Sequence, residues 1–139
     1  AASATAAHRA GEVRHVTALR DRLVDGILTA VPDAVETGPR ACKVAGNAHL
    51  RFSGVESEAL LVLLDDAGVC ASAGSACASG AMDPSHVLLA LGIPAEEALG
   101  SLRMSLGPTT TDAEVDLAIA AVPAAVDRLR STLEELEAV

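Results

Sequence analysis

Cys77 is the residue of this 139-residue chain whose surroundings most clearly indicate chemistry. Between Val69 and Met82 no side chain is larger than that of cysteine, so the run has little to bury and is typical of a loop. A thiol in an exposed loop is open to oxidation, which makes it a liability unless it is used. We therefore interpret Cys77 as a reactive thiol, and we expect the loop 72–82 to be more mobile than the segments beside it.

Familiar arrangements that activate a nucleophile are not found around this thiol. A nucleophile elbow needs glycine two residues to either side, and those places hold Ser75 and Ser79. His86 is the nearest histidine for a Cys–His dyad, but a solvated histidine on the first turn of the next helix is the simpler interpretation. No lysine follows Gly80, so the run is not a phosphate-binding loop either. Cys77 thus lacks an obvious base of its own.

The other two cysteines are predicted to pack inside the protein rather than to bind a metal ion. Cys42 and Cys70 are interpreted as small packing residues, the usual behaviour of free cysteines. No C-x₂-C spacing occurs, so no metal site is expected. An odd number of cysteines argues against a disulfide framework and favours a reducing cytoplasm.

Hydrophobic periodicity and turn residues predict the elements around the loop. A first helix is predicted over 3–31 by the apolar positions Val13, Val16, Leu19, Leu23 and Ile27, and Pro32 ends it. Further helices are predicted over 56–68 with Gly68 as its C-cap, over 83–92 with Asp83 as N-cap and Pro84 in the first turn, and from Thr111 onward. Thr111 and Glu114 have the spacing of a capping box, and Pro123 lies inside this last helix, where proline can bend it.

Short strands alternate with these helices. They are predicted around Val35, at 42–44, at 49–53, at 69–71 and at 101–106. In the last strand, Leu102, Met104 and Leu106 face one way and Ser101, Arg103 and Ser105 the other. The fold class is therefore α+β, a small few-stranded sheet packed with helices, formed by residues 1–139 as a single domain.

Composition restricts the partners. Ten basic against nineteen acidic residues give a net charge of −9, and Phe52 is the one aromatic residue, so binding to nucleic acid is not expected. No apolar run approaches the length of about 18 residues that spans a bilayer, and no membrane association is expected either.

Three segments carry a resemblance to a known family. The stretch "SAGSACASGAMDPSHVLLALG" resembles the active-cysteine loop of cysteine desulfurases, in the group with a long loop around Gly-Ser-Ala-Cys. The stretches "NAHLRFSGVESEALLVLLDDAGV" and "GSLRMSLGPTTTDAEVD" are similar to the segments before and after that loop. The resemblance covers nearly the whole chain and implies the C-terminal small domain of a class V, fold-type I pyridoxal-phosphate enzyme.

The resemblance also implies a reaction and its residues. The reaction takes sulfur from L-cysteine and leaves L-alanine, with pyridoxal 5'-phosphate as cofactor. Cys77 matches the nucleophile that then carries a persulfide, and Arg103 matches the arginine that binds the substrate carboxylate. A guanidinium can hold a carboxylate through two parallel hydrogen bonds, which agrees with this role. The alternative is that Arg103 forms a surface ion pair at a strand edge.

The chain also departs from the family, because a desulfurase holds its cofactor on a lysine that follows a histidine. The one lysine, Lys43, has no histidine before it and is interpreted as an ordinary surface residue. The family's phosphate-binding and ring-stacking residues are absent too. We therefore expect no cofactor-binding residue in this chain, a large cofactor domain that is missing from it, and no desulfuration by the chain alone.

Two other readings stay open at this stage. One is a stand-alone persulfide carrier that works without pyridoxal phosphate, and the other is a structural fragment with no activity of its own. As a desulfurase, the protein is expected to pass sulfur to an iron–sulfur scaffold protein or to a tRNA-thiolation partner, and to form a homodimer when complete.

Overall fold

The computed structural model describes residues 2–73 and 84–137 of the chain. In order, the elements are α1 (Ala2–Ala30), β1 (Val35–Glu36), the short 3₁₀ helix η1 (Arg40–Cys42), β2 (Asn47–Arg51), α2 (Ser57–Asp66), α3 (His86–Ala90), α4 (Ala95–Leu99), β3 (Ser101–Ser105) and α5 (Asp112–Glu137). The strands form one antiparallel sheet in the order β1–β2–β3. The predicted α+β class is confirmed.

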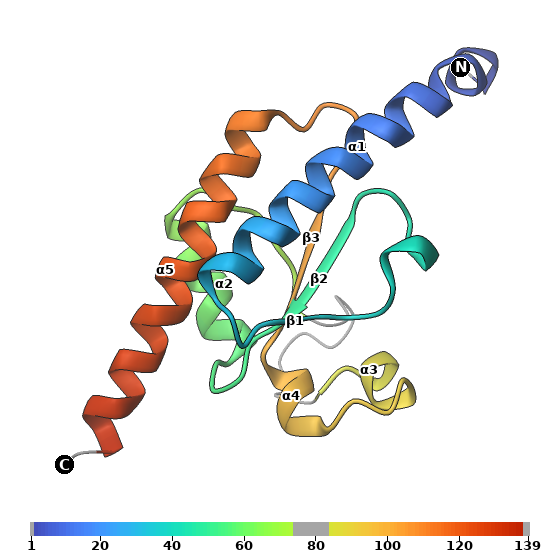
Figure 1. Ribbon diagram of the computed structural model, residues 1–139. Coiled ribbons are helices and arrows are strands. Elements are labelled where there is room, and N and C mark those ends of the chain that lie inside the picture. Colours follow the sequence, from blue (N-terminus) through green and yellow to red (C-terminus); the bar gives the residue numbers. More distant parts are fainter. Residues whose placement is uncertain (1, 74–83, 138–139) are drawn as a thin grey trace.

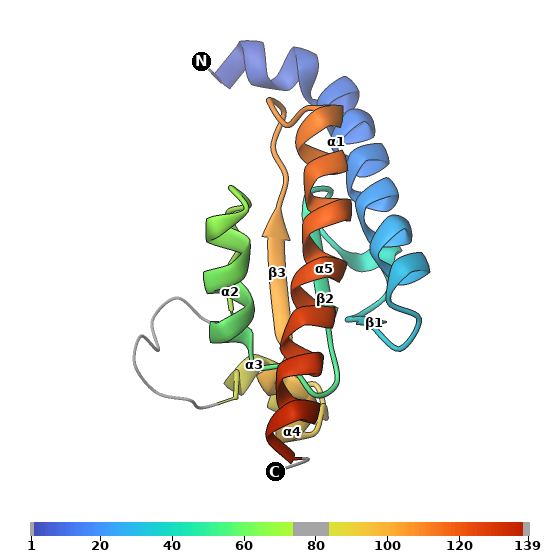
Figure 2. The same ribbon diagram turned by 90° about the vertical axis from the view of Figure 1, so that its left-hand side faces the viewer.

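The long helices α1 and α5 run side by side, and both lie against the sheet (Figures 1 and 2). Of the apolar positions predicted to form the buried face of α1, Val16, Leu19, Leu23 and Ile27 are all at most 5% exposed. Val13 is 45% exposed, contrary to the prediction. The reason is geometric: the N-terminal part of α1 extends past the sheet, where nothing in the described chain covers it (Figure 1).

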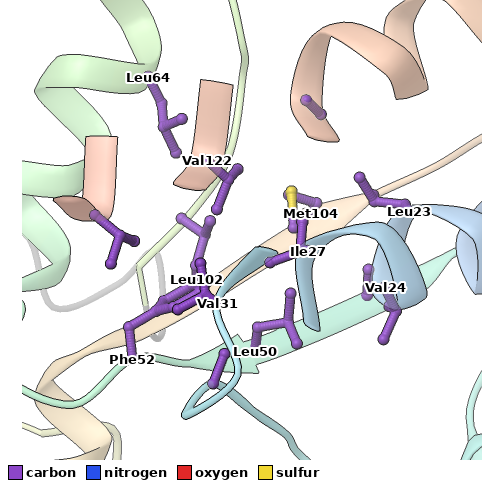
Figure 3. Close-up of a cluster of buried hydrophobic side chains, with 14 of the residues drawn as sticks. Leu23, Val24, Ile27, Val31, Leu50, Phe52, Leu64, Leu102, Met104 and Val122 are labelled. Carbon is purple, nitrogen blue, oxygen red and sulfur yellow. The ribbon is translucent and has the colours of Figure 1, made fainter. Parts of the chain in front are cut away.

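The hydrophobic core fills the space between the sheet and the helices α1, α2 and α5 (Figure 3). The sheet contributes Ala48, Leu50, Leu102 and Met104 from its strands and Phe52 directly after β2, all at most 4% exposed. They alternate with polar residues along β2 and β3, since successive side chains of a strand point to opposite faces. The sheet therefore has one apolar, covered face and one polar face.

Several predicted element ends are confirmed. Gly68 has a positive φ of 77°, the conformation that suits glycine at a helix C-terminus, but the C-cap of α2 is Ala67, one residue before the predicted position. Before α5, Thr111 N–H donates to Glu114 Oε2 at 2.7 Å and Glu114 N–H donates to Thr111 Oγ1 at 3.3 Å, so the capping box is formed. Helix α5 continues through Pro123.

Two predicted strands are wrong. Residues 42–44 form no strand, because Cys42 N–H and Lys43 N–H bond back to Pro39 and Arg40 and close the turns of η1 instead. Residues 69–71 form no strand either: Val69 N–H bonds to Leu64 at the end of α2, and pairing is limited to one antiparallel bridge at the next residue, Ser72.

Other details also differ from expectation. Helix α3 begins at His86 with Ser85 as its N-cap, so Pro84 precedes the helix, and Asp83 lies outside the described residues. Helix α4 was not predicted. Ser101 follows the predicted alternation but is only 1% exposed, because Ser57 at the start of α2 covers this end of β3 and donates to the Ser101 carbonyl at 2.7 Å.

No helix in residues 2–73 and 84–137 is long and apolar enough to cross a bilayer.

Candidate functional site

The polar face of the sheet brings Arg103 of β3 next to His49 of β2. The two residues are direct partners in the register of the strands. The backbone N–H and C=O of Arg103 bond to Ser72, while the C=O of His49 accepts a bond from Thr37 N–H. Both residues thus turn their backbone groups away from each other and form a non-hydrogen-bonded pair, the type in which facing side chains come closest.

On its other edge, β3 is joined to the start of the small-residue loop. Ser72 N–H donates to the Arg103 carbonyl at 2.9 Å, and Arg103 N–H donates to the Ser72 carbonyl at 2.8 Å. Arg103 therefore lies between His49 on one side and Ser72 on the other. The sequence places Cys77 five residues after Ser72, so covalent geometry limits the Cα separation of these two residues to about 18 Å.

Arg103 differs from the other cations near this face. Lys43 Nζ is paired with Glu36 Oε1 at 2.7 Å, and Arg51 is paired with Glu97. Within residues 2–73 and 84–137, no carboxylate lies within ion-pair distance of Arg103, whose side chain is partly exposed. The alternative of a surface ion pair for Arg103 is thus not supported in this part of the chain.

The side chain of His49 is partly buried. Its Nδ1 lies 3.1 Å from Thr37 Oγ1. Burial first, and then the positive charges of Lys43, Arg103 and Arg51, together lower the pKa of His49 to about 4. The imidazole is therefore neutral at neutral pH.

The predicted nucleophile Cys77 and its loop lie largely outside the described residues, so both the assignment of Cys77 and the expected mobility of 72–82 stay predictions. The predicted packing role of Cys42 and Cys70 is wrong, since both are exposed free thiols. Cys42 ends η1 and Cys70 lies in the irregular segment after α2, so neither is in the predicted strand, and neither is part of the core. His86 is exposed at the start of α3, as expected of a solvated histidine.

The residues present do not fit pyridoxal phosphate. Lys43 is not the ordinary surface lysine that was expected: its side chain is 9% exposed, and its amine is engaged by Glu36. Phe52, the one aromatic ring, is 1% exposed within the core and cannot stack on a cofactor. No group of three potential metal ligands occurs in the described part of the chain. Within residues 2–73 and 84–137, neither Lys43 nor Phe52 is therefore placed to hold this cofactor.

A separate cavity of about 770 Å³ lies between the C-terminal end of β2 and α5. Phe52, Leu129 and Leu133 contribute to its lining, but neither His49 nor Arg103 does. It is therefore not part of the site on the polar face.

The sequence singled out Arg103 but not His49, its direct partner across the sheet. The stretch that carries His49 predicts a strand by its alternation and contributes to the family resemblance, but neither tells which residue of another strand lies opposite His49. His49 is identified by the register of the two strands, which is known only once β2 and β3 are paired in the structure.

Comparison with known proteins assigns the chain to a family. The family model described as aminotransferase class-V matches residues 6–117, and the chain therefore belongs to the class-V aminotransferases. Two curated relatives are the IscS-like cysteine desulfurase of Mycobacterium tuberculosis, 50% identical over 81% of this chain, and the cysteine desulfurase NifS of Azotobacter vinelandii, 45% identical over 86%. The matched regions are 29% and 30% of those proteins, so the chain spans about a third of their length.

Solved structures support the fold. An X-ray structure of a NifS-like protein from Rickettsia africae superposes with a TM-score of 0.73 over 86% of this chain and 30% of its own, at 22% sequence identity. The fold predicted from the sequence, and its resemblance to cysteine desulfurases, are thereby confirmed.

Proposed function

We propose that residues 1–139 are one domain, the C-terminal small domain of a cysteine desulfurase that takes sulfur from L-cysteine and leaves L-alanine. Arg103 binds the substrate carboxylate, and Cys77 accepts the sulfur. The observation that carries this proposal is the double hydrogen bond between Ser72 and Arg103, because it ties the root of the Cys77 loop to the strand that presents the carboxylate-binding side chain. Substrate and thiol are then brought to the same edge of the sheet.

The covalent step balances between the thiol and the substrate. The Cys77 thiolate forms an S–S bond to the substrate sulfur while the C–S bond of the substrate breaks. The electron pair stays on the carbon, which takes up a proton and becomes the methyl group of alanine. Cys77 is left as a persulfide, so no outside oxidant or reductant is needed. Pyridoxal phosphate, which would make the C–S bond labile, is held by a large domain outside this chain.

Three further features belong to the same proposal. The persulfide passes to a sulfur-acceptor protein such as an iron–sulfur scaffold, the complete enzyme is a homodimer, and it works in the cytoplasm. A stand-alone persulfide carrier is not favoured, because the curated relatives are cysteine desulfurases rather than carriers.

The test compares this chain with a complete enzyme in which it is joined to a large domain, for example that of the Mycobacterium tuberculosis relative. With pyridoxal phosphate and L-cysteine, the complete enzyme should release alanine and gain the mass of one sulfur atom on the peptide that contains Cys77. The chain alone should release no alanine above background. Alanine formation by the chain alone, or persulfide on Cys42 or Cys70 only, would refute the proposal.

A further inference from the structure

We propose that His49 is a second substrate-binding residue, which donates an Nε2–H hydrogen bond to the same carboxylate that Arg103 holds. This inference rests on the proposed function and adds a residue that fixes how the substrate carboxylate is oriented. It comes from the cross-strand pairing of His49 and Arg103 on the polar face of the sheet.

The position of His49 is suited to this role. In a non-hydrogen-bonded antiparallel pair, the Cβ atoms of facing residues are about 4.5–5.5 Å apart, which is within reach of one carboxylate held between their side chains. Both residues sit on rigid strands, and their backbone groups are fixed from outside, by Thr37 for His49 and by Ser72 for Arg103. The pair is therefore preorganised to hold a ligand.

The charges around the pair favour an anion. Lys43 and Arg51 are each paired with a carboxylate, on Glu36 and Glu97, whereas Arg103 has no such partner among the described residues. A partly exposed cation next to a neutral hydrogen-bond donor is a combination that suits a carboxylate.

Thr37 gives the imidazole its orientation. Its hydroxyl lies 3.1 Å from Nδ1. The proposed contact requires the tautomer in which the neutral ring carries its proton on Nε2 and Nδ1 accepts a hydrogen bond from this hydroxyl. Because the low pKa of His49, about 4, keeps the ring neutral, it adds a directed N–H bond without adding a second full charge. Arg103 then supplies attraction and two parallel bonds, while His49 restrains rotation of the carboxylate about the guanidinium.

The experiment uses three variants of the complete enzyme. His49→Phe keeps a flat ring but removes both nitrogens, His49→Gln keeps an N–H near the place of Nε2, and Ser105→Ala is a control on the exposed end of β3. We expect His49→Phe to raise KM for L-cysteine about tenfold with kcat changed less than about twofold, since a hydrogen bond to a charged group is worth about 1.5–3 kcal/mol. His49→Gln should recover most of the loss, and Ser105→Ala should behave as the wild type.

An equal loss in His49→Phe and His49→Gln would indicate a merely structural role and overturn the inference, as would an unchanged KM in His49→Phe. Thr37→Val gives a further check, because it removes the hydroxyl that holds Nδ1 while keeping the shape. It should raise KM less than His49→Phe does, and a larger effect than that of His49→Phe would contradict the proposed arrangement.

A binding measurement separates this inference from the proposed function. In this chain, acetate serves as a bare carboxylate probe, followed by the NMR signals of the His49 ring and of Arg103 Nε. We expect both sets of signals to shift together and the affinity to fall in His49→Phe. If the signals shift in this way but the complete enzyme produces no alanine, the proposed function is refuted while the carboxylate site is supported. Shifts at Arg103 that are unaffected by His49→Phe would overturn the inference alone.

Discussion

Ser72 and Arg103 exchange two backbone hydrogen bonds, of 2.9 and 2.8 Å, although thirty residues separate them in the sequence. This bridge makes Arg103 the point where the sheet and the small-residue loop meet. Its other neighbour is His49, across the β2–β3 pair. Arg103 thus lies between Ser72, which begins the small-residue loop, and the neutral imidazole of His49, and several of the predictions below follow from that arrangement.

Arg103→Lys should weaken the use of L-cysteine by the complete enzyme. Lysine keeps the positive charge but cannot form two parallel bonds to a carboxylate. We expect kcat/KM to fall about ten- to a hundredfold, since a charge-assisted hydrogen bond is worth about 1.5–3 kcal/mol. Steady-state kinetics measures this, with Arg128→Lys on the exposed surface of α5 as the matched control. Equal effects of the two substitutions would mean that Arg103 is not the carboxylate-binding residue.

Cys77→Ser should abolish persulfide formation while leaving substrate binding intact, because a hydroxyl is not an effective nucleophile towards sulfur. Mass spectrometry of the complete enzyme after exposure to L-cysteine measures the persulfide, and a substrate titration measures binding. Cys42→Ser and Cys70→Ser are the controls, since both of these thiols are exposed and therefore open to nonspecific modification. Normal turnover by Cys77→Ser with loss of turnover in either control would show that another thiol carries the sulfur.

His49 should make this chain less stable in mild acid. Its pKa is about 4 in the folded state and about 6.5 in an unfolded chain, so between these values the unfolded state binds more protons. The free energy of unfolding should therefore fall as the pH drops from about 6.5 to 4, by on the order of 1–2 kcal/mol after solvent screening is allowed for.

Chemical denaturation at pH 7, 5.5 and 4 measures this effect, with His49→Gln compared against the wild type. The difference between the two proteins removes the contributions of carboxylates that titrate in the same range. The exposed His86 provides the control variant, His86→Gln. A pH dependence that is the same in wild type and His49→Gln would contradict the lowered pKa.

Gly100→Ala should destabilise the fold strongly. A Cβ atom at Gly100 would lie 2.0 Å from the backbone oxygen of Phe52 and 2.8 Å from that of Val55, so the start of β3 would have to move away from β2. We expect a loss of more than about 2 kcal/mol in the free energy of unfolding. Gly107→Ala is the matched control, because nothing lies within 4 Å of a Cβ placed there. A loss no greater than that of the control would mean that β2 and β3 approach less closely at this point.

The sequence by itself determined the elements with strong local signals. The periodic residues of α1 apart from Val13, the alternation in β2 and β3, the glycine that follows α2 and the Thr111–Glu114 capping box are present as predicted. Such signals depend on neighbours within a few residues in the sequence, so these elements can be predicted without knowledge of the fold. The motifs around Cys77 and Arg103 were likewise sufficient to indicate the family.

Only the tertiary structure decided the features that depend on contacts between distant residues. The exposure of Val13 follows from where the sheet ends, and the exposure of Cys42 and Cys70 follows from turns that replaced the predicted strands. The pairing of His49 with Arg103 depends on strand register. Register is set by the burial of whole strand faces together with the close approach of backbones at points such as Gly100, and a single strand's sequence does not contain that information.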